Sequence, residues 1–362
     1  MAVELNYSKL DRLLHRLAFA GNAIQFTAAD IERTMFSASY KSVRGERPIF
    51  VTSLPRAGTT LMLEVLYRFP SLASHVYRDM PFVMAPVLWA HLSGSFRRPQ
   101  ELRERAHGDG VQVGYDSPEA FEEILWRAFW PEKYHQDRID LWARDDQSSE
   151  AREFFVEHMK KIIALRRPDR PEDGRYVSKN NGNVARLDLI SAMFPDAKIL
   201  VPIRRPLAHA RSLLNQHRRF LEMQRETPFV RRYMGDIGHY EFGSLHRPIA
   251  FPGFEALKGA HTPLQLDYWI AYWIAAFEYV RARQEQLILA SYEDCCFGAA
   301  RAVEQMCARL DIPHDGALQE AVATFRDSPS GGGGTQADVD LALLERANQL
   351  HAKLLESALG VQ

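Results

Sequence analysis

Apolar and polar positions follow two different periods along this chain. Short apolar runs rich in β-forming residues are each followed by a segment with helical spacing of its apolar residues. Strands that alternate with helices at this spacing indicate βαβ units and a parallel sheet. The strands are predicted at Pro48–Leu54, in 176–181, in 197–206 and at Gln286–Asp294, and the helices at Thr59–Arg68, in 184–194 and in 207–224.

Other segments flank or interrupt this α/β pattern. Two amphipathic helices are expected at Tyr7–Ala20 and Thr27–Phe36, with Ser8 and Thr27 as N-caps. Residues 80–170 are predicted to be a mostly helical insertion, and 226–262 to be an irregular lid or substrate wall. The resulting division is an N-terminal helical segment at 1–45, a core domain at 46–325, and a Gly-rich loop with a final helix (Val339–Leu359) at 326–362.

Composition narrows the class of protein. The chain has 362 residues, of which 46% are hydrophobic and 25% charged, as in a soluble globular protein. Its net charge of −1 argues against a general nucleic-acid binder, which normally carries a basic excess. Three cysteines without paired spacing predict neither a disulfide framework nor a zinc site. The charged N-terminus does not resemble a signal peptide and no long apolar run is present, so a cytoplasmic protein without a membrane span is expected.

The loop after the first strand is a candidate anion site. The sequence breaks at Leu54-Pro55-Arg56-Ala57-Gly58 and resumes as a helix, but it lacks the G-x-x-x-x-G-K-[ST] pattern of nucleotide triphosphatases. Gly58 lets the backbone approach a ligand, and Thr59 and Thr60 open a helix whose amides can donate to an anion. Arg56 adds a planar cationic fork. A simple turn is the alternative interpretation.

A second loop at the same predicted sheet edge adds another cation. Arg204 ends a strand, Pro206 begins the next helix, and Ser212 lies about two helical turns farther on. A guanidinium and a hydroxyl in this arrangement can hold one phosphate. Alternatively, Arg204 forms a salt bridge and Ser212 only packs.

Together the two loops resemble a known pattern. "SLPRAGTTL" resembles the 5′-phosphosulfate loop of sulfotransferases, P-[KR]-[SA]-G-T-[TS], and "IRRPLAHARS" resembles their 3′-phosphate element. The loop is most similar to the version with Arg, found in many bacterial members and in tyrosylprotein sulfotransferases. "FPDAKIL" and "ASYEDCC" also fit, so the resemblance covers about residues 47–310 in order and spacing.

The resemblance implies a fold, a donor and a reaction. The fold would be a P-loop-like three-layer α/β fold around a central parallel sheet. The donor would be 3′-phosphoadenosine-5′-phosphosulfate (PAPS), whose sulfuryl group would pass to a hydroxyl or amine without a metal. The 5′-phosphosulfate would be held by Arg56, Ala57, Gly58, Thr59 and Thr60, and the 3′-phosphate by Arg204 and Ser212. Many relatives stack adenine on a Trp soon after the loop; Leu61 and Met62 follow here, so the adenine platform is left open.

The general base is sought in the segment that follows the first helix of the core. Relatives with the Arg-type loop carry a Glu shortly after the first helix, where this chain reads "SHVYRDMPF". Asp79 is the predicted base because it is the only carboxylate there, and His75 is the alternative. For Asp79, an ordinary role as N-cap or salt-bridge partner competes. Lys179, in "YVSKNNGN", is a further candidate for contact with the sulfuryl group or acceptor, against ordinary turn chemistry.

The acceptor is less defined. The helix "LDYWIAYWIAAFEYV" carries aromatic residues at helical spacing, which predicts core packing on one face and leaves an acceptor wall open on another. Such aromatic surface suits a small-molecule, lipid or glycan acceptor. "SGGGGT" is predicted to be a linker, with a nest of amides over the nucleotide as the alternative. Two other functions compete: a nucleotide-dependent phosphotransferase, and a non-catalytic relative that binds the nucleotide without turnover.

Overall fold

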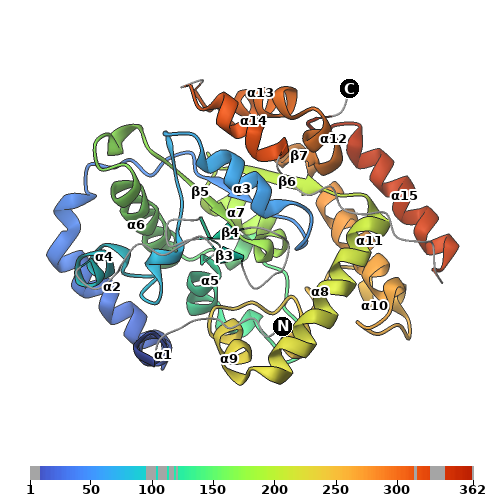
Figure 1. Ribbon diagram of the computed structural model, residues 1–362, viewed down its shortest axis with the longest axis horizontal. Coiled ribbons are helices and arrows are strands. Elements are labelled where there is room, and N and C mark those ends of the chain that lie inside the picture. The colour runs from blue at the N-terminus through green and yellow to red at the C-terminus, as the bar shows by residue number, and fades with distance from the viewer. Residues whose placement is uncertain are drawn as a thin grey trace.

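A five-stranded parallel sheet runs through the centre of the computed structural model (Figure 1). The structure describes residues 9–94, 103–104, 112–113, 118–119, 121–313, 316–326 and 339–360. The strands are β1 (Ile49–Val51), β2 (Leu72–Ala73), β5 (Arg175–Lys179), β6 (Lys198–Ile203) and β7 (Ile288–Ser291), in the order β2-β5-β1-β6-β7. A separate two-stranded antiparallel ribbon is formed by β3 (Arg103–Glu104) and β4 (Gln112–Val113).

Helices cover both faces of this sheet, which gives the three-layer α/β fold expected. The helices are α1 (Lys9–Ala18), α2 (Asn22–Phe36), α3 (Thr59–Tyr67), α4 (Pro86–Ser93), α5 (Glu123–Phe129), α6 (Ser149–Arg166), α7 (Leu187–Met193), α8 (Pro206–Glu226), α9 (Pro228–Asp236), α10 (Phe254–Lys258), α11 (Leu266–Arg281), α12 (Tyr292–Phe297), α13 (Ala299–Leu310), α14 (Leu318–Arg326) and α15 (Leu341–Leu355).

The alternation of strand residues explains the two hydrophobic layers. Ile49 and Val51 of β1 pack in a cluster with α3, α13 and α14, whereas Phe50 between them packs in the cluster that includes α6, α7 and α11. Successive side chains of a strand point to opposite faces, so one buried strand serves two cores. This is why the strands read as continuous apolar runs.

The strand order reverses at β1. From β1 the chain goes to β2 and β5 on one side, and then returns to β6 and β7 on the other. In open α/β sheets, ligands bind at the carboxyl ends of the strands where the order reverses. The loops after β1 and β6, which begin near Leu54 and Arg204, therefore meet at this point.

Several local predictions are corrected or refined. Thr27 lies inside α2, which begins at Asn22, so it is not an N-cap. The short strand β2 was not predicted, because two residues carry no periodic signal. The 226–262 segment contains α9 and α10 and buries several aromatic side chains, so it is less irregular than expected. Ser8 and the Gly-rich run at 328–335 lie outside the described residues.

The last described residues return to the sheet. Leu359 forms a parallel bridge with Ala290 of β7. Its amide donates to Leu289 at 2.8 Å, and its carbonyl accepts from the amide of Ser291 at 3.0 Å. The outer edge of β7 is therefore paired by the segment after α15. Among the described helices, none combines the length and apolar character needed to cross a membrane.

Candidate active site

The loop between β1 and α3 is a tight turn with a strained backbone. Arg56 has φ 71° and Gly58 has φ 97°, both in the left-handed region. Gly58 is the N-cap residue of α3, and the ring of Tyr292 lies against it: a Cβ at position 58 would be 2.3 Å from Cδ2 of Tyr292. Only glycine fits this position. The start of α3 at Thr59 therefore lies at the carboxyl edge of the sheet, where helix N-terminal amides are suited to an anion.

Arg204, which directly follows the neighbouring strand β6, contacts this loop. Its Nη1 donates to the carbonyl of Arg56 at 3.0 Å, and its guanidinium carbon lies 5.2 Å from the centre of the Tyr292 ring. The Nε atom of Arg204 is buried and has no hydrogen-bond partner among the residues described. A buried cationic donor without an acceptor is costly, and an anion at this position would satisfy it.

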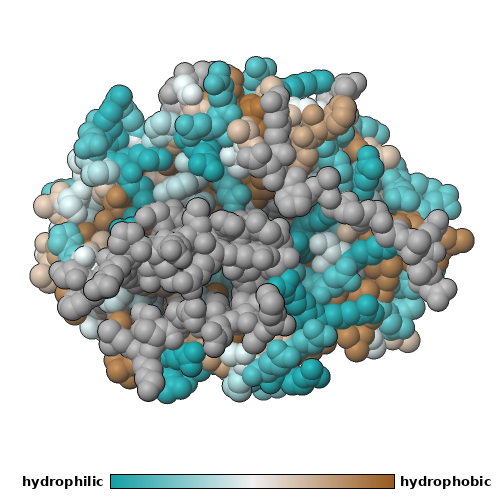
Figure 2. All heavy atoms as spheres, viewed as in Figure 1, coloured by the Kyte–Doolittle hydropathy of each residue, from teal (hydrophilic) through white to brown (hydrophobic). Residues whose placement is uncertain are grey.

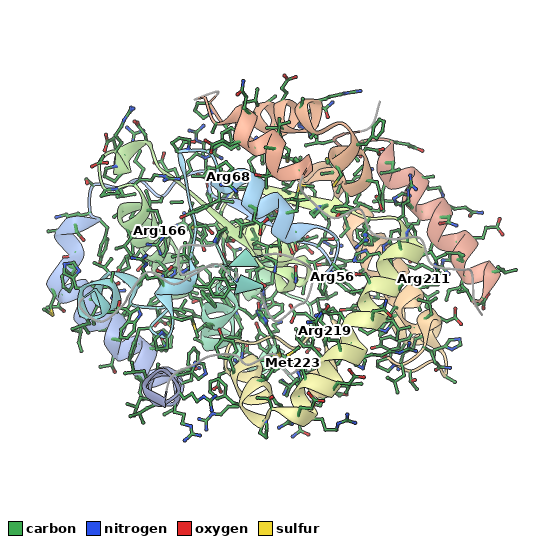
Figure 3. The ribbon with its side chains drawn as sticks, in the orientation of Figure 1. Arg56, Arg68, Arg166, Arg211, Arg219 and Met223 are labelled. Atoms are coloured by element: carbon green, nitrogen blue, oxygen red, sulfur yellow. The ribbon has the colours of Figure 1, made fainter. Side chains whose placement is uncertain are left out.

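Ser212 lies on α8, the helix predicted to follow the Arg204 strand, and its hydroxyl is beside Arg56. The Nε of Arg56 donates to Oγ of Ser212 at 3.2 Å. Pro206 begins α8, where its missing amide hydrogen costs nothing. Figure 3 shows Arg56 next to α8, with Arg211 and Arg219 on the same helix. Hydrophilic residues follow this helix on the face shown in Figure 2. The structure thus brings together Arg56, Arg204 and Ser212.

His209 on α8 also fixes the loop. Its Nε2 lies 2.8 Å from the carbonyl of Pro55, to which it must donate because a carbonyl only accepts. Burial lowers the pKa of His209 to about 3; the bond to Pro55 opposes this, and the charges of Arg204 and Arg56 reinforce it. His209 is therefore a neutral positioning residue.

The loop after β5 approaches α3 from the other side. Lys179 is the buried last residue of β5, in register with Val51 of β1. Asn181 follows, and its Oδ1 accepts a hydrogen bond from Oγ1 of Thr59 at 3.0 Å. The hydroxyl of Thr59 therefore donates its only proton to Asn181. An anion at this helix end would be met by the amide of Thr59 and by Thr60.

A buried ion pair holds the β5 loop in place. Arg186 is fully buried and pairs with Glu123 at 2.7 Å, with its guanidinium carbon 5.0 Å from the Trp126 ring and 4.3 Å from the Trp142 ring. The second oxygen of Glu123 accepts from Nδ2 of Asn180 at 2.7 Å. Burial raises the pKa of Glu123, but Arg186 and the hydrogen bonds outweigh it, and the net shift is downward.

Asp79 and His75 lie together in a different buried cluster. Oδ2 of Asp79 accepts from His75 and from the amide of Val76, and Oδ1 is bound by Arg166. Burial raises the pKa of Asp79, but Arg166 and His75 outweigh this effect and hold the pKa well below its ordinary value. The second ring nitrogen of His75 contacts His158 at 2.8 Å. A carboxylate engaged on both oxygens is a weak base, so this geometry favours a structural role for the pair. The assignment of the base to either residue remains a prediction that these contacts do not support.

A pocket opens beside the loop at the same sheet edge. Its space, the open mouth and adjoining solvent included, amounts to about 540 Å³. Its wall includes Leu54 and Pro55 of the loop, Asn181, Glu241 from the 226–262 segment, and Trp269 and Tyr272 of α11. This aromatic helix therefore serves both the core and the pocket, and the 226–262 segment forms part of the wall.

Sequence reasoning gave no role to four residues at this site. Tyr292 and Asn181 each follow a strand at the carboxyl edge, a position that could have marked them. His209 lies three residues before Ser212, on the first turn of α8. Glu241 had no signal, because it lies in a segment without periodicity. Among the residues described, no group of three or more His, Cys, Asp or Glu side chains is arranged to hold a metal.

The comparison with protein families agrees with the two loops. The family model described as "Sulfotransferase family" matches residues 48–247, more than half of the chain and the region that contains both loops. The chain belongs to the sulfotransferase family. It is therefore a sulfotransferase-family enzyme with the corresponding α/β fold, and a phosphotransferase function is not favoured.

One solved structure shows the same fold at low identity, and a second is reported beside it. The sulfotransferase STF9 from Mycobacterium avium has a TM-score of 0.51 at 14% identity, covering 98% of this chain and 87% of that one. The sulfotransferase STF1 from Mycobacterium tuberculosis has a TM-score of 0.48 at 14% identity, covering 97% of this chain and 88% of that one. No curated protein matches this chain significantly.

Proposed function

We propose that this protein transfers the sulfuryl group of PAPS to a hydroxyl or amine of a small-molecule, lipid or glycan acceptor. The observation that carries the proposal is the convergence of Arg56, Arg204 and Ser212 where the strand order reverses, with the unpaired Nε of Arg204 buried among them. Two arginines, a hydroxyl and a helix N-terminus suit a ligand with two separate anionic groups.

Each part of the site has a distinct task in this reaction. Arg204 and Ser212 hold the 3′-phosphate and so discriminate PAPS from ordinary adenylates. The amides of Gly58, Thr59 and Thr60 hold the 5′-phosphosulfate, while the amide of Ala57 closes the loop by donating to the carbonyl of Leu54. Lys179 approaches from β5. Charge grows on the departing bridging oxygen as the S–O bond breaks, and Arg56 neutralises it.

Calorimetry with three nucleotides tests the donor. Wild type should bind 3′,5′-adenosine diphosphate more tightly than 5′-AMP or magnesium ATP, because only this ligand presents the 3′-phosphate. Arg204→Ala and Ser212→Ala should each lose that preference, while the exposed neighbour in Arg205→Ala should keep it. Thermal unfolding of each variant shows whether a loss reflects the site or the fold.

The alternatives give different results in the same experiment. A preference for magnesium ATP would favour a phosphotransferase and overturn the proposal. Tight 3′,5′-adenosine diphosphate binding without turnover of any acceptor would favour the non-catalytic relative.

A further inference from the structure

Glu241 places a carboxylate in the pocket next to the phosphosulfate loop. It lies between α9 and α10, half-buried, in the wall of the pocket. Its Oε1 accepts from Nδ2 of Asn181 at 3.4 Å, a long hydrogen bond of the kind that tightens when a substrate binds. Asn181 in turn accepts from Thr59, the first residue of α3. Two hydrogen bonds therefore connect Glu241 to the helix end that faces the sulfuryl group in the proposed function.

The bridging amide has only one orientation that satisfies both neighbours. An ionised carboxylate only accepts hydrogen bonds, so Asn181 must turn its NH₂ group to Glu241. Its carbonyl oxygen is then left for Thr59, whose hydroxyl donates. With the opposite orientation, two oxygens would face each other at the Glu241 end. Asn181 thus acts as a positioning residue that fixes the carboxylate relative to the loop.

Two other titratable groups in the pocket wall, Glu123 and His246, are already engaged in an ion pair or in hydrogen bonds. Glu123 is locked by Arg186, with Asn180 and Tyr134 as further donors. His246 donates from Nδ1 to the carbonyl of Glu241, so its Nε2 is an acceptor occupied by the hydroxyl of Tyr268.

Three candidates besides Glu241 remain after these groups are set aside. The hydroxyl of Tyr240 is engaged, because it donates to the carbonyl of Gly235 at 3.2 Å. Tyr272 is the next group in the wall, and its hydroxyl accepts from the amide of Ile249, while burial raises its pKa. His239 also lines the pocket, but within the described part of the chain no hydrogen bond ties its ring to the loop. Glu241 alone is connected to the loop by a defined chain of contacts.

We propose that Glu241 is the general base of the transfer, and that the pocket accepts an alcohol or phenol with an apolar ring. This inference rests on the proposed function. The acceptor oxygen attacks sulfur, its proton passes to the carboxylate of Glu241, and the S–O bond to the 5′-phosphate breaks. The bond pair stays on the bridging oxygen, which leaves on 3′,5′-adenosine diphosphate, and no redox change occurs.

The apolar residues of the pocket wall explain the choice of an apolar ring. Trp269 and Tyr272 of α11 face this space together with Ile139 and Ile249. Aromatic and branched apolar side chains bind flat hydrocarbon surface and leave the hydroxyl to the one polar group that can receive its proton.

Three probe acceptors with different acidity test the base. Phenol, benzyl alcohol and 4-nitrophenol are assayed with PAPS at mildly alkaline pH, where only 4-nitrophenol is largely ionised. Glu241→Gln should lose about 10²–10⁴-fold in kcat with phenol and benzyl alcohol, and far less with 4-nitrophenol, which needs no base. Glu226→Gln, an exposed glutamate at the end of α8, should behave as wild type. Glu241→Gln should also bind 3′,5′-adenosine diphosphate as wild type does.

The contrary results are distinct. An equal loss with all three acceptors, or a selective loss in His239→Gln instead, would overturn the assignment to Glu241. If wild type binds 3′,5′-adenosine diphosphate but turns over none of the probes, the proposed acceptor class is wrong. The assignment of Glu241 as the general base is then overturned as well. If wild type does not prefer 3′,5′-adenosine diphosphate, the proposed function itself fails.

Discussion

The Nε of Arg56 donates to Oγ of Ser212 at 3.2 Å, although the two residues are 156 positions apart in the chain. A serine hydroxyl has one proton and two lone pairs, so it can accept from Arg56 and still donate to a phosphate. The two ends of a bound nucleotide would therefore be linked through one side-chain contact. Binding at either end would polarise the donor at the other.

Ser212→Ala tests whether this hydroxyl holds the 3′-phosphate. The variant should lose about 10- to 100-fold in affinity for 3′,5′-adenosine diphosphate, because a hydrogen bond to a charged group is worth about 1.5–3 kcal/mol. Affinity for 5′-AMP should change little. Calorimetry on both nucleotides measures the difference, with the exposed Ser39→Ala as a control. An equal loss for both nucleotides would show that Ser212 supports the loop rather than reading the 3′-phosphate.

Gly58 is constrained both by its φ and by the ring of Tyr292. Gly253 has a similar φ of 78° but nothing within 4 Å of an added Cβ. Gly253→Ala should therefore cost about 1–2 kcal/mol of stability, from the left-handed backbone alone. Gly58→Ala should cost a further ~1–3 kcal/mol of overpacking and weaken 3′,5′-adenosine diphosphate binding. Urea unfolding and nucleotide titration measure both effects, and equal losses in the two variants would contradict the role of Tyr292.

The buried pair of Arg186 and Glu123 should be far more sensitive than a surface pair. Arg186→Met leaves the carboxylate of Glu123 buried without its charge partner, which typically costs about 3–5 kcal/mol. Arg346→Met breaks the exposed pair with Glu278 and should cost less than about 1 kcal/mol. Urea unfolding of both variants is the measurement. Similar losses would mean that the Trp126 and Trp142 rings, rather than the charge, hold position 186.

His209 should make stability depend on pH. Its pKa is lowered from 6.5 to about 3 by burial, with the charges of Arg204 and Arg56 added, against the opposing bond to Pro55. Between these values the unfolded chain binds a proton that the folded chain does not, because Nδ1 is buried without a partner. Stability should therefore fall as pH drops below 6.5, by up to about 1.4 kcal/mol per pH unit from this group.

His209→Gln removes that contribution, so its stability should fall less between pH 7 and pH 5 than that of wild type. Urea unfolding at each pH gives the slope. His261→Gln, at a half-exposed position, serves as the control and should keep the wild-type slope. A wild-type slope in His209→Gln would assign the pH dependence to other groups.

The sequence predicts the main sheet well because four of its strands are buried on both faces. Runs such as Ile49–Val51 and residues 199–203 of β6 are apolar throughout, and each leads into a helix. β2 has two residues and is held by pairing with β5, so its existence depends on tertiary contacts that no local pattern encodes. Thr27 shows the same limit, since a good capping residue inside α2 was mistaken for its start.

The residues of the candidate site also divide into those that the local sequence predicts and those that depend on tertiary packing. Residues in the loops that follow strands, such as Arg56 and Arg204, can be inferred because the ends of parallel strands share one edge of the sheet. Glu241 could not, because its place depends on how the 226–262 segment packs against α8 and α11. Asp79 is predicted as the base because it is the only carboxylate in its segment, but Arg166, 87 positions later, engages it.

The bridge between Leu359 and Ala290 bears on how copies of this protein behave toward one another. Without the residues after α15, β7 would present a row of unpaired amides and carbonyls at the rim of the sheet. Exposed strand edges recruit strands from other chains. The segment after α15 thus covers a sheet edge that would otherwise be open to pairing with a strand of another chain.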